Sequence, residues 1–139
     1  MHLALIDTGV LFALANRSEM RHAVALEAAH AWLAARNEFV LLDWVFVETM
    51  TLIKSRLGST TALHTGRALR HNPVYRWVAL SPDDEREVWA TFQQYAEKDW
   101  SYTDCGLLVM SQGLKVARVF TFDAHFDQMP GVKRVGVRA

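Results

Sequence analysis

Four carboxylate side chains are the strongest candidates for chemistry in this chain: Asp7, Glu48, Asp104 and Asp123. Two ionised carboxylates about 4 Å apart repel each other by ~4 kcal/mol at an effective dielectric constant near ~20, enough to raise a pKa by roughly three units. A divalent cation between them removes this repulsion. Oxygen ligands without a cysteine cluster suit Mg²⁺ or Mn²⁺ rather than zinc, and such sites commonly activate water against a phosphodiester. If the four acids converge, we expect hydrolysis of a phosphate ester.

The four acids follow predicted strands or lie in the first turns of predicted helices. Asp7 directly follows the apolar run Leu3–Ile6, and Asp123 comes two residues after the run Val116–Thr121. The other two acids lie in early turns of helices. In open parallel sheets the carboxyl ends of the strands form the crevice in which ligands bind. We therefore expect all four acids at one edge of the sheet.

Each acid also has a purely structural explanation. Asp7 could cap a helix that begins near Val10, and Asp104 could interact favourably with its own helix dipole. Asp123 could begin a turn, and Glu48 could be an exposed helix residue. For any single acid the structural explanation is favoured; the placement of four acids on one predicted edge favours the metal site.

Short apolar runs alternate with helical patterns along the chain, which is typical of βαβ units. The runs are apolar throughout rather than alternating, so both faces of the sheet are expected to be covered. This pattern predicts an α/β fold, a three-layer α/β/α sandwich with a mostly parallel central sheet. The predicted strands are Leu3–Ile6, Phe39–Leu42, Val74–Leu80, Val116–Thr121 and a weaker edge strand, Val132–Val137. The predicted helices are Met20–Arg36, Val45–Leu57, Ser59–His71, one that begins at Ser81-Pro82, and one through Gly106–Gln112.

Capping residues mark several of the predicted helix ends. Gly58 and Gly113 stand where helix C-termini are expected. Ser59 is predicted to cap the helix that follows it, and Ser81 to cap one whose first turn holds proline and three acids. The segment Ser101–Asp104 resembles a capping box.

The composition excludes several classes of protein. The chain has 139 residues without a repeat, a low-complexity tract or a flexible linker, so residues 1–139 are expected to form a single domain. Hydrophobic residues make up 51%, which is enough to bury a core and argues against an intrinsically disordered chain. Fifteen basic residues balance fifteen acidic ones, so any affinity for nucleic acid must come from a local patch.

The sequence predicts a soluble protein of the cytoplasm. The single Cys105 excludes an internal disulfide and fits a reducing compartment. The N-terminus is not expected to hold a secretory leader or a transit peptide. The longest apolar stretches fall far below the roughly 18 residues that span a bilayer, so no membrane contact is expected.

The four acids lie in short motifs whose order and spacing resemble those of PIN domains over nearly the whole chain. The resemblance is closest to the compact VapC-like toxin ribonucleases. It implies a single PIN-like nuclease domain and Mg²⁺- or Mn²⁺-dependent cleavage of single-stranded or structured RNA. The motifs are Ile6-Asp7-Thr8, Val47-Glu48-Thr49, Ser101-Tyr102-Thr103-Asp104 and Thr121-Phe122-Asp123.

The same resemblance implies a role for each residue. Asp7, Glu48 and Asp104 would hold the main metal ion, and Asp123 would complete or tune the site, so all four would be both catalytic and metal-binding. Gly9 departs from the pattern, because many relatives have another small polar residue there. The residues implied to orient water or carboxylates are Thr8, Ser101 and Thr121.

RNA is predicted to lie beside the acidic pocket, because residues 49–82 contain five cations and no acid, and phosphate backbones attract such patches. An ordinary solvated helix face remains an alternative, since these side chains need not point one way. Trp100, just before the third acid, could stack on an unpaired base or fill the core. The five cations are Lys54, Arg56, Arg67, Arg70 and Arg76.

Several functions fit these features. We expect an endoribonuclease that is the toxin of a type II toxin–antitoxin system, with RNA as substrate and a cognate antitoxin protein as partner. A housekeeping RNA-processing nuclease, or a noncatalytic module that binds RNA or a partner, are the alternatives. Phosphotransfer domains also place an aspartate after the first strand, but Gly9 stands where a haloacid-dehalogenase-type phosphatase has its second acid. The apolar helices Met20–Arg36 and Glu87–Lys98 favour a homodimer.

Overall fold

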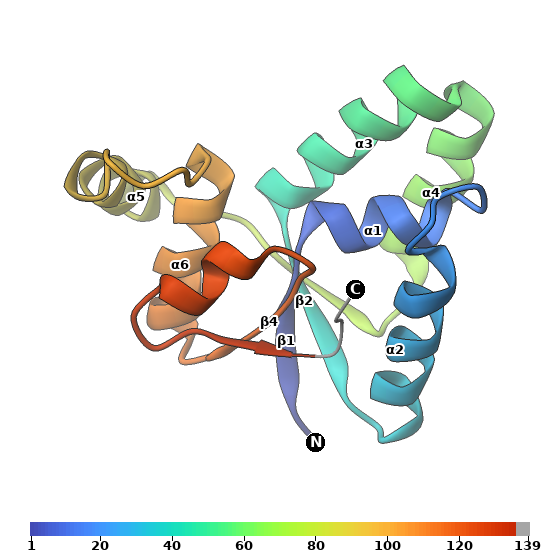
Figure 1. The fold of residues 1–139 in the computed structure, drawn as a ribbon, viewed down its shortest axis with the longest axis horizontal. Coiled ribbons are helices and arrows are strands. Elements are labelled where there is room, and N and C mark those ends of the chain that lie inside the picture. Colours follow the sequence, from blue (N-terminus) through green and yellow to red (C-terminus); the bar gives the residue numbers. More distant parts are fainter. Residues whose placement is uncertain (136–139) are drawn as a thin grey trace.

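The computed structural model describes residues 1–135, which form a sheet with helices packed against it (Figure 1). In chain order the elements are β1 (Leu3–Ile6), α1 (Thr8–Ala15), α2 (His22–Ala34), β2 (Glu38–Leu42), α3 (Asp43–Leu57), α4 (Ser59–His71), β3 (Tyr75–Val78), α5 (Pro82–Gln94), α6 (Tyr102–Leu114), β4 (Arg118–Phe120), the 3₁₀ helix η1 (Ala124–Gln128) and β5 (Lys133–Val135).

The five strands are parallel and lie in the order β3-β2-β1-β4-β5. Leu5 in the central strand lies opposite Val40 of β2 and Val119 of β4. Helices α1 and α2 lie on one side of these strands and α5 and α6 on the other (Figure 1). The predicted α/β sandwich with a mostly parallel central sheet is confirmed.

The core is built on side chains of the three central strands. Ala4, Leu5 and Ile6 of β1 are fully buried, as expected for a strand that is apolar on both faces. Phe39 of β2 and Phe120 of β4 meet edge to face across β1, with ring centroids 5.1 Å apart. This packing joins β2 and β4 across β1, and the predicted site lies beyond the carboxyl ends of these strands.

The predicted capping box at Ser101–Asp104 and the predicted cap at Ser81 are confirmed, and Ser81 also forms a capping box. Ser81 and Ser101 each accept a hydrogen bond from the backbone N–H three residues later, and the acid at that position accepts one in return. Gly58 ends α3 with φ of 95°, a conformation that glycine adopts without strain. Ser59 does not cap α4: the helix begins at Ser59 itself, and Gly58 alone separates it from α3.

Other predicted boundaries were wrong by a few residues. Helix α6 does not stop at Gly113 but continues to Leu114. It ends at Lys115, which adopts the left-handed conformation. The predicted strand at Val116–Thr121 is shortened to Arg118–Phe120, and Thr121 turns instead toward the site. For the predicted edge strand Val132–Val137 the structure has β5, while residues 136 and 137 lie outside the described part of the chain.

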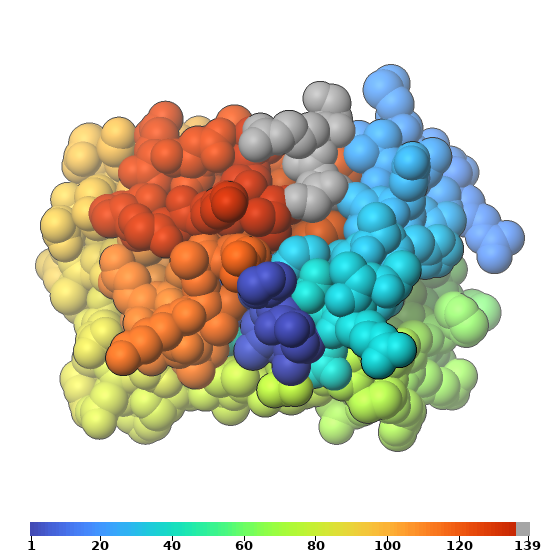
Figure 2. All heavy atoms as spheres, turned by 90° about the horizontal axis from the view of Figure 1, so that it is seen from below, coloured from blue at the N-terminus to red at the C-terminus, as the bar shows by residue number. Residues whose placement is uncertain are grey.

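The two edges of the sheet differ. Figure 2 shows the edge where the strands begin, with the N-terminal segment in blue between segments coloured cyan and orange. All strands run away from this face, so their carboxyl ends, the side chains that follow β1 and β4 among them, lie at the opposite edge. In residues 1–135 no helix is both long enough and apolar enough to cross a membrane.

A substitution at Phe120 tests how much this core packing contributes to the stability of the fold. We expect Phe120→Leu to lower the free energy of unfolding by about 1–2 kcal/mol, because the smaller side chain leaves a gap against Phe39. Phe92→Leu is the matched control, since Phe92 is 37% exposed, and should cost less than half as much. Urea denaturation followed by circular dichroism measures both; equal losses would contradict this view of the core.

Candidate active site

A cavity of about 640 Å³ lies at the carboxyl ends of β1 and β4, and all four predicted acids line it. They arrive from four different parts of the chain: the end of β1, the second turn of α3, the first turn of α6 and the segment after β4. The expectation that they share one edge of the sheet is confirmed. The lining residues are Asp7, Thr8, Gly9, Arg21, Glu48, Asp99, Ser101, Asp104, Thr121, Phe122, Asp123, Ala124 and His125.

Asp7 lies where β1 ends and α1 begins. One carboxylate oxygen caps α1 by accepting a hydrogen bond from the backbone N–H of Thr8 at 2.8 Å. The other oxygen accepts a hydrogen bond from the Thr121 hydroxyl, also at 2.8 Å. The capping role and the place in the cavity are therefore compatible, because each uses a different oxygen of the same carboxylate.

The surroundings raise the pKa of Asp7 to about 6. Burial is the largest cause, since it disfavours the charged carboxylate, and the charges of Asp104 and Glu48 add to it. The hydrogen bonds from Thr121 and Thr8 oppose the shift. The two hydrogen bonds thus only partly offset the rise in the pKa of Asp7 that burial and the two neighbouring charges cause.

Asp104 is held by the capping box of α6. Its carboxylate accepts a hydrogen bond from the backbone N–H of Ser101 at 2.9 Å, and the Ser101 hydroxyl accepts one from the backbone N–H of Asp104 at 3.0 Å. Burial raises the pKa of Asp104, while the contacts with Ser101 and His125 lower it. Ser101 therefore orients this carboxylate.

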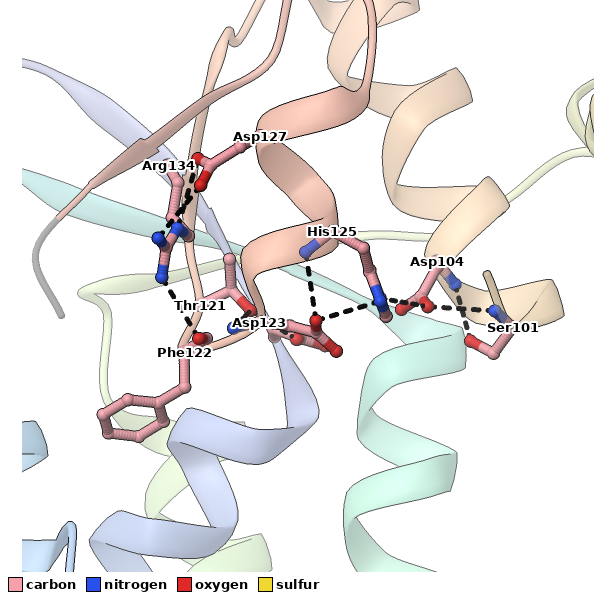
Figure 3. Close-up of polar contacts among 9 residues, drawn as sticks. Ser101, Asp104, Thr121, Phe122, Asp123, His125, Asp127 and Arg134 are labelled. Atoms are coloured by element: carbon pink, nitrogen blue, oxygen red, sulfur yellow. Dashed lines mark hydrogen bonds and ion pairs between the residues drawn. The ribbon is translucent and has the colours of Figure 1, made fainter. Parts of the chain in front are cut away.

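His125 joins two of the acids (Figure 3). Its Nε2 lies 2.9 Å from a carboxylate oxygen of Asp104, and its Nδ1 lies 2.9 Å from one of Asp123. His125 was not among the site residues predicted from the sequence, in which a turn histidine was favoured over a phosphate contact. Its position two residues after Asp123 indicates that it lies near this acid but does not indicate its contact with Asp104.

Asp123 caps η1, and with 46% of its side chain accessible it is more exposed than His125 and Asp104. The Thr121 hydroxyl accepts a hydrogen bond from the backbone N–H of Asp123 at 3.0 Å while donating to Asp7. Thr121 therefore couples the segment after β4 to the carboxylate after β1. Glu48 is exposed on α3 and completes the acidic lining.

Thr8 differs from the expectation in one respect. Its backbone N–H, and not its hydroxyl, contacts Asp7. In the described part of the chain the buried Thr8 hydroxyl oxygen has no hydrogen-bond partner, although it belongs to a residue that lines the cavity. A buried hydroxyl without a partner is costly, and a ligand or a water in the cavity would satisfy it.

The donor set of the cavity fits a hard divalent cation. It offers carboxylate and hydroxyl oxygens, the negative field around Asp7 is not neutralised, and Thr8 has an unused hydroxyl. Within residues 1–135, however, no three acids, histidines or cysteines are grouped closely enough to hold a metal ion by themselves. Mg²⁺ usually keeps several waters and uses few carboxylates directly, which suits so wide a cavity.

Trp100 and the five cations predicted to contact RNA do not line the cavity. Trp100 is 5% exposed and packs on Tyr95, so it fills the core and is not a base-stacking surface. Asp99 lines the cavity, whereas Asp127 pairs with Arg134 outside it. None of the five cations in residues 49–82 lines the cavity.

In a parallel α/β sheet, a cavity at the carboxyl ends of the strands is the place where ligands bind. Residues 4–132 match the model of the PIN domain family. The chain belongs to the PIN domain family. No curated protein matches the sequence.

Solved structures share the fold over nearly the whole chain. The toxin VapC20 of Mycobacterium tuberculosis, described as cleaving the sarcin-ricin loop, is 24% identical over 99% of both chains, with a TM-score of 0.82. A toxin–antitoxin complex from Klebsiella pneumoniae is 22% identical over 98% of this chain and 99% of its own, with a TM-score of 0.67. VapBC2 from Rickettsia felis, bound to a promoter DNA fragment, is 12% identical over 96% and 97%, with a TM-score of 0.69.

The raised pKa of Asp7 predicts a pH-dependent cost in stability. In the folded protein the Asp7 carboxyl has a pKa of about 6, whereas its ordinary pKa is 3.8. Between these two values the unfolded chain has lost the proton and the folded protein still holds it, so the free energy of unfolding falls as the pH rises from 3.8 to about 6. We expect the unfolding free energy of Asp7→Asn, relative to that of wild type, to increase by about 1–3 kcal/mol as the pH rises from 4 to 6.5 in the presence of a chelator.

The control is Asp84→Asn, which removes an acid from a capping box outside the cavity. Its unfolding free energy, relative to wild type, should not rise over the same pH range. Denaturant titrations at half-unit pH intervals supply the data. A constant difference between Asp7→Asn and wild type across this range would contradict the account of the acidic cavity.

Proposed function

We propose that the protein is an endoribonuclease that depends on Mg²⁺ or Mn²⁺ and hydrolyses phosphodiester bonds of RNA. The observation that carries this proposal is the shared cavity: four acids from separate elements line it in a chain that belongs to the PIN domain family. Burial, and to a smaller extent the charges of Asp104 and Glu48, raise the pKa of Asp7, and a cation bound beside this carboxylate would offset both effects.

Three acids are proposed to hold the main metal ion, partly through its water ligands, because no three among the described residues are grouped closely enough to bind it alone: Asp7, Glu48 and Asp104. Asp123 completes the site from the exposed side. When bound, a divalent ion here supplies Lewis acidity for the attack of water on the phosphodiester. The Thr121 hydroxyl and the Thr8 backbone N–H each fix one oxygen of Asp7. Ser101 fixes one oxygen of Asp104, so the fold orients both carboxylates.

We further propose that this nuclease is the toxin of a type II toxin–antitoxin system and works in the cytoplasm with a cognate antitoxin as partner. The likeness in fold to VapC20 and to two toxin–antitoxin complexes supports this assignment. A housekeeping RNA-processing nuclease would have the same acids, so the chemistry does not separate the two. A small antitoxin gene beside this one, whose product forms a complex with the protein, would distinguish them.

The homodimer stays a prediction. Both helices that suggested it expose apolar side chains: Val24 and Leu26 on α2 are 37% and 38% exposed, and Trp89 and Phe92 on α5 are 52% and 37% exposed. Such surface favours association in solution. Analytical ultracentrifugation of the purified protein should give the mass of two chains, and a single-chain mass at micromolar concentration would contradict it.

Cleavage of RNA tests the proposed function directly. We expect the purified protein to cut a mixed RNA pool with Mg²⁺ or Mn²⁺ and to lose activity in chelator. Asp104→Asn should lower the cleavage rate by at least ~100-fold, because the variant loses a charge that holds the ion. Gel electrophoresis of labelled RNA measures the rate.

Asp84→Asn is the matched control for this variant. Asp84 and Asp104 occupy the same position in capping boxes of nearly the same geometry, but only Asp104 lines the cavity. Asp84→Asn should cleave at the wild-type rate. Cleavage that survives chelation, or equal losses in the two variants, would reject the metal mechanism, and RNA binding without any cleavage would favour the noncatalytic alternative.

A further inference from the structure

Arg21 is the one lysine or arginine among the described residues that line the acidic cavity. It lies just before α2, in the segment that joins α1 to α2. The cations of residues 49–82, which were predicted to contact RNA, do not line the cavity. Arg21 therefore presents positive charge where the substrate backbone would pass.

The position of the Arg21 guanidinium is set by two contacts. Its Cζ lies 4.4 Å from the centre of the Phe122 ring, and its Nε lies 3.3 Å from a carboxylate oxygen of Glu19. The Glu19 carboxylate also accepts a hydrogen bond from the backbone N–H of Arg21. These contacts restrain the side chain before any ligand binds.

The restrained guanidinium keeps hydrogen-bonding capacity. Within residues 1–135 its Nε is used by Glu19, while its two Nη groups make no hydrogen bond, and 42% of the side chain is exposed. Two Nη groups and a fixed plane match the oxygens of a phosphate, which arginine binds in a bidentate manner.

The arrangement of Phe122 fixes the side of the cavity on which Arg21 lies. Figure 3 shows the Phe122 ring projecting away from the group formed by Asp104, Asp123 and His125. Arg21 packs over this ring, so its charge is separated from the side occupied by that group. A phosphate held by Arg21 would therefore be a neighbour of the one that reaches the acids.

We propose that Arg21 binds a backbone phosphate of the RNA next to the scissile one. This inference rests on the proposed nuclease function and adds a substrate contact to the same cavity. The acids repel a polyanion, and a metal ion offsets that repulsion most strongly for the phosphate it contacts, because the attraction falls with distance. A fixed cation at the opposite side adds to this for the neighbouring phosphate and constrains the path of the strand across the site.

Binding of a short, fluorescein-labelled single-stranded RNA in EDTA, measured by anisotropy at several salt concentrations, tests this contact. We expect Arg21→Gln to raise the Kd about 5- to 10-fold and to reduce the slope of log Kd against log salt by about 0.7, the value for one phosphate contact on a single strand. Arg21→Lys, which keeps the charge but loses the planar fork, should fall between this variant and wild type.

Arg17→Gln is the matched control, because Arg17 is an exposed arginine in the same segment that does not line the acidic cavity. It should change Kd less than 2-fold and leave the salt slope unchanged. In Mg²⁺, Arg21→Gln should raise KM and leave kcat within about 2-fold of wild type, as expected for a binding contact. Thermal melts of Arg21→Gln and Arg21→Lys show whether either variant is unfolded at the assay temperature.

The outcomes separate this inference from the proposed function. Wild-type cleavage with an unchanged salt slope in Arg21→Gln overturns the phosphate contact and leaves the nuclease proposal standing. Equal losses of slope in Arg17→Gln and Arg21→Gln also overturn it, because the effect is then one of general charge. A reduced slope in Arg21→Gln alone supports the contact, even if wild type binds RNA without cutting it, a result that would overturn the nuclease proposal.

Discussion

Repulsion among carboxylates at the carboxyl ends of the strands is the constraint on which the site depends. Asp7 is partly buried and faces the charges of Asp104 and Glu48, which together raise its pKa to about 6. The fold offsets part of this cost with hydrogen-bond donors: the Thr121 hydroxyl on Asp7, and a backbone N–H and the His125 ring on Asp104. What remains is a deficit of positive charge, which a divalent cation would supply.

The residues of the site also build the fold around it. Asp7 caps α1, Asp104 closes the capping box of α6, and Asp123 caps η1. Asp84 shows that capping alone does not make a site, since it has the same box geometry on α5 and does not line the cavity. The structural explanation for each acid is therefore correct but incomplete, because one carboxylate can fix a helix terminus and still present an oxygen to the cavity.

Local sequence predicted the five strands and five of the helices because their determinants are local, whereas α1 and η1 were not among the predicted elements. Apolar runs marked the strands, and the serine, proline and acidic residues at the start of α5 marked its first turn. The acids could be assigned to one edge because they follow those elements. His125 and Arg21 could not be placed this way: the ring of His125 reaches Asp104 across 21 positions, and Arg21 packs on a phenylalanine 101 residues later, so both depend on tertiary packing.

The strand order explains why acids so distant in sequence meet. β1 lies at the centre of the sheet, between β2 and β4. Asp7 at its end is therefore beside the segment that leaves β4 with Asp123 and beside the helix that leaves β2 with Glu48. Helix α6, which leads into β4, brings Asp104 to the same edge at its N-terminus. Ile6, directly before Asp7, pairs with Phe120, directly before Thr121. A shift of one residue in this register would therefore turn Asp7 away from Thr121 and break the hydrogen bond that couples the two strand ends.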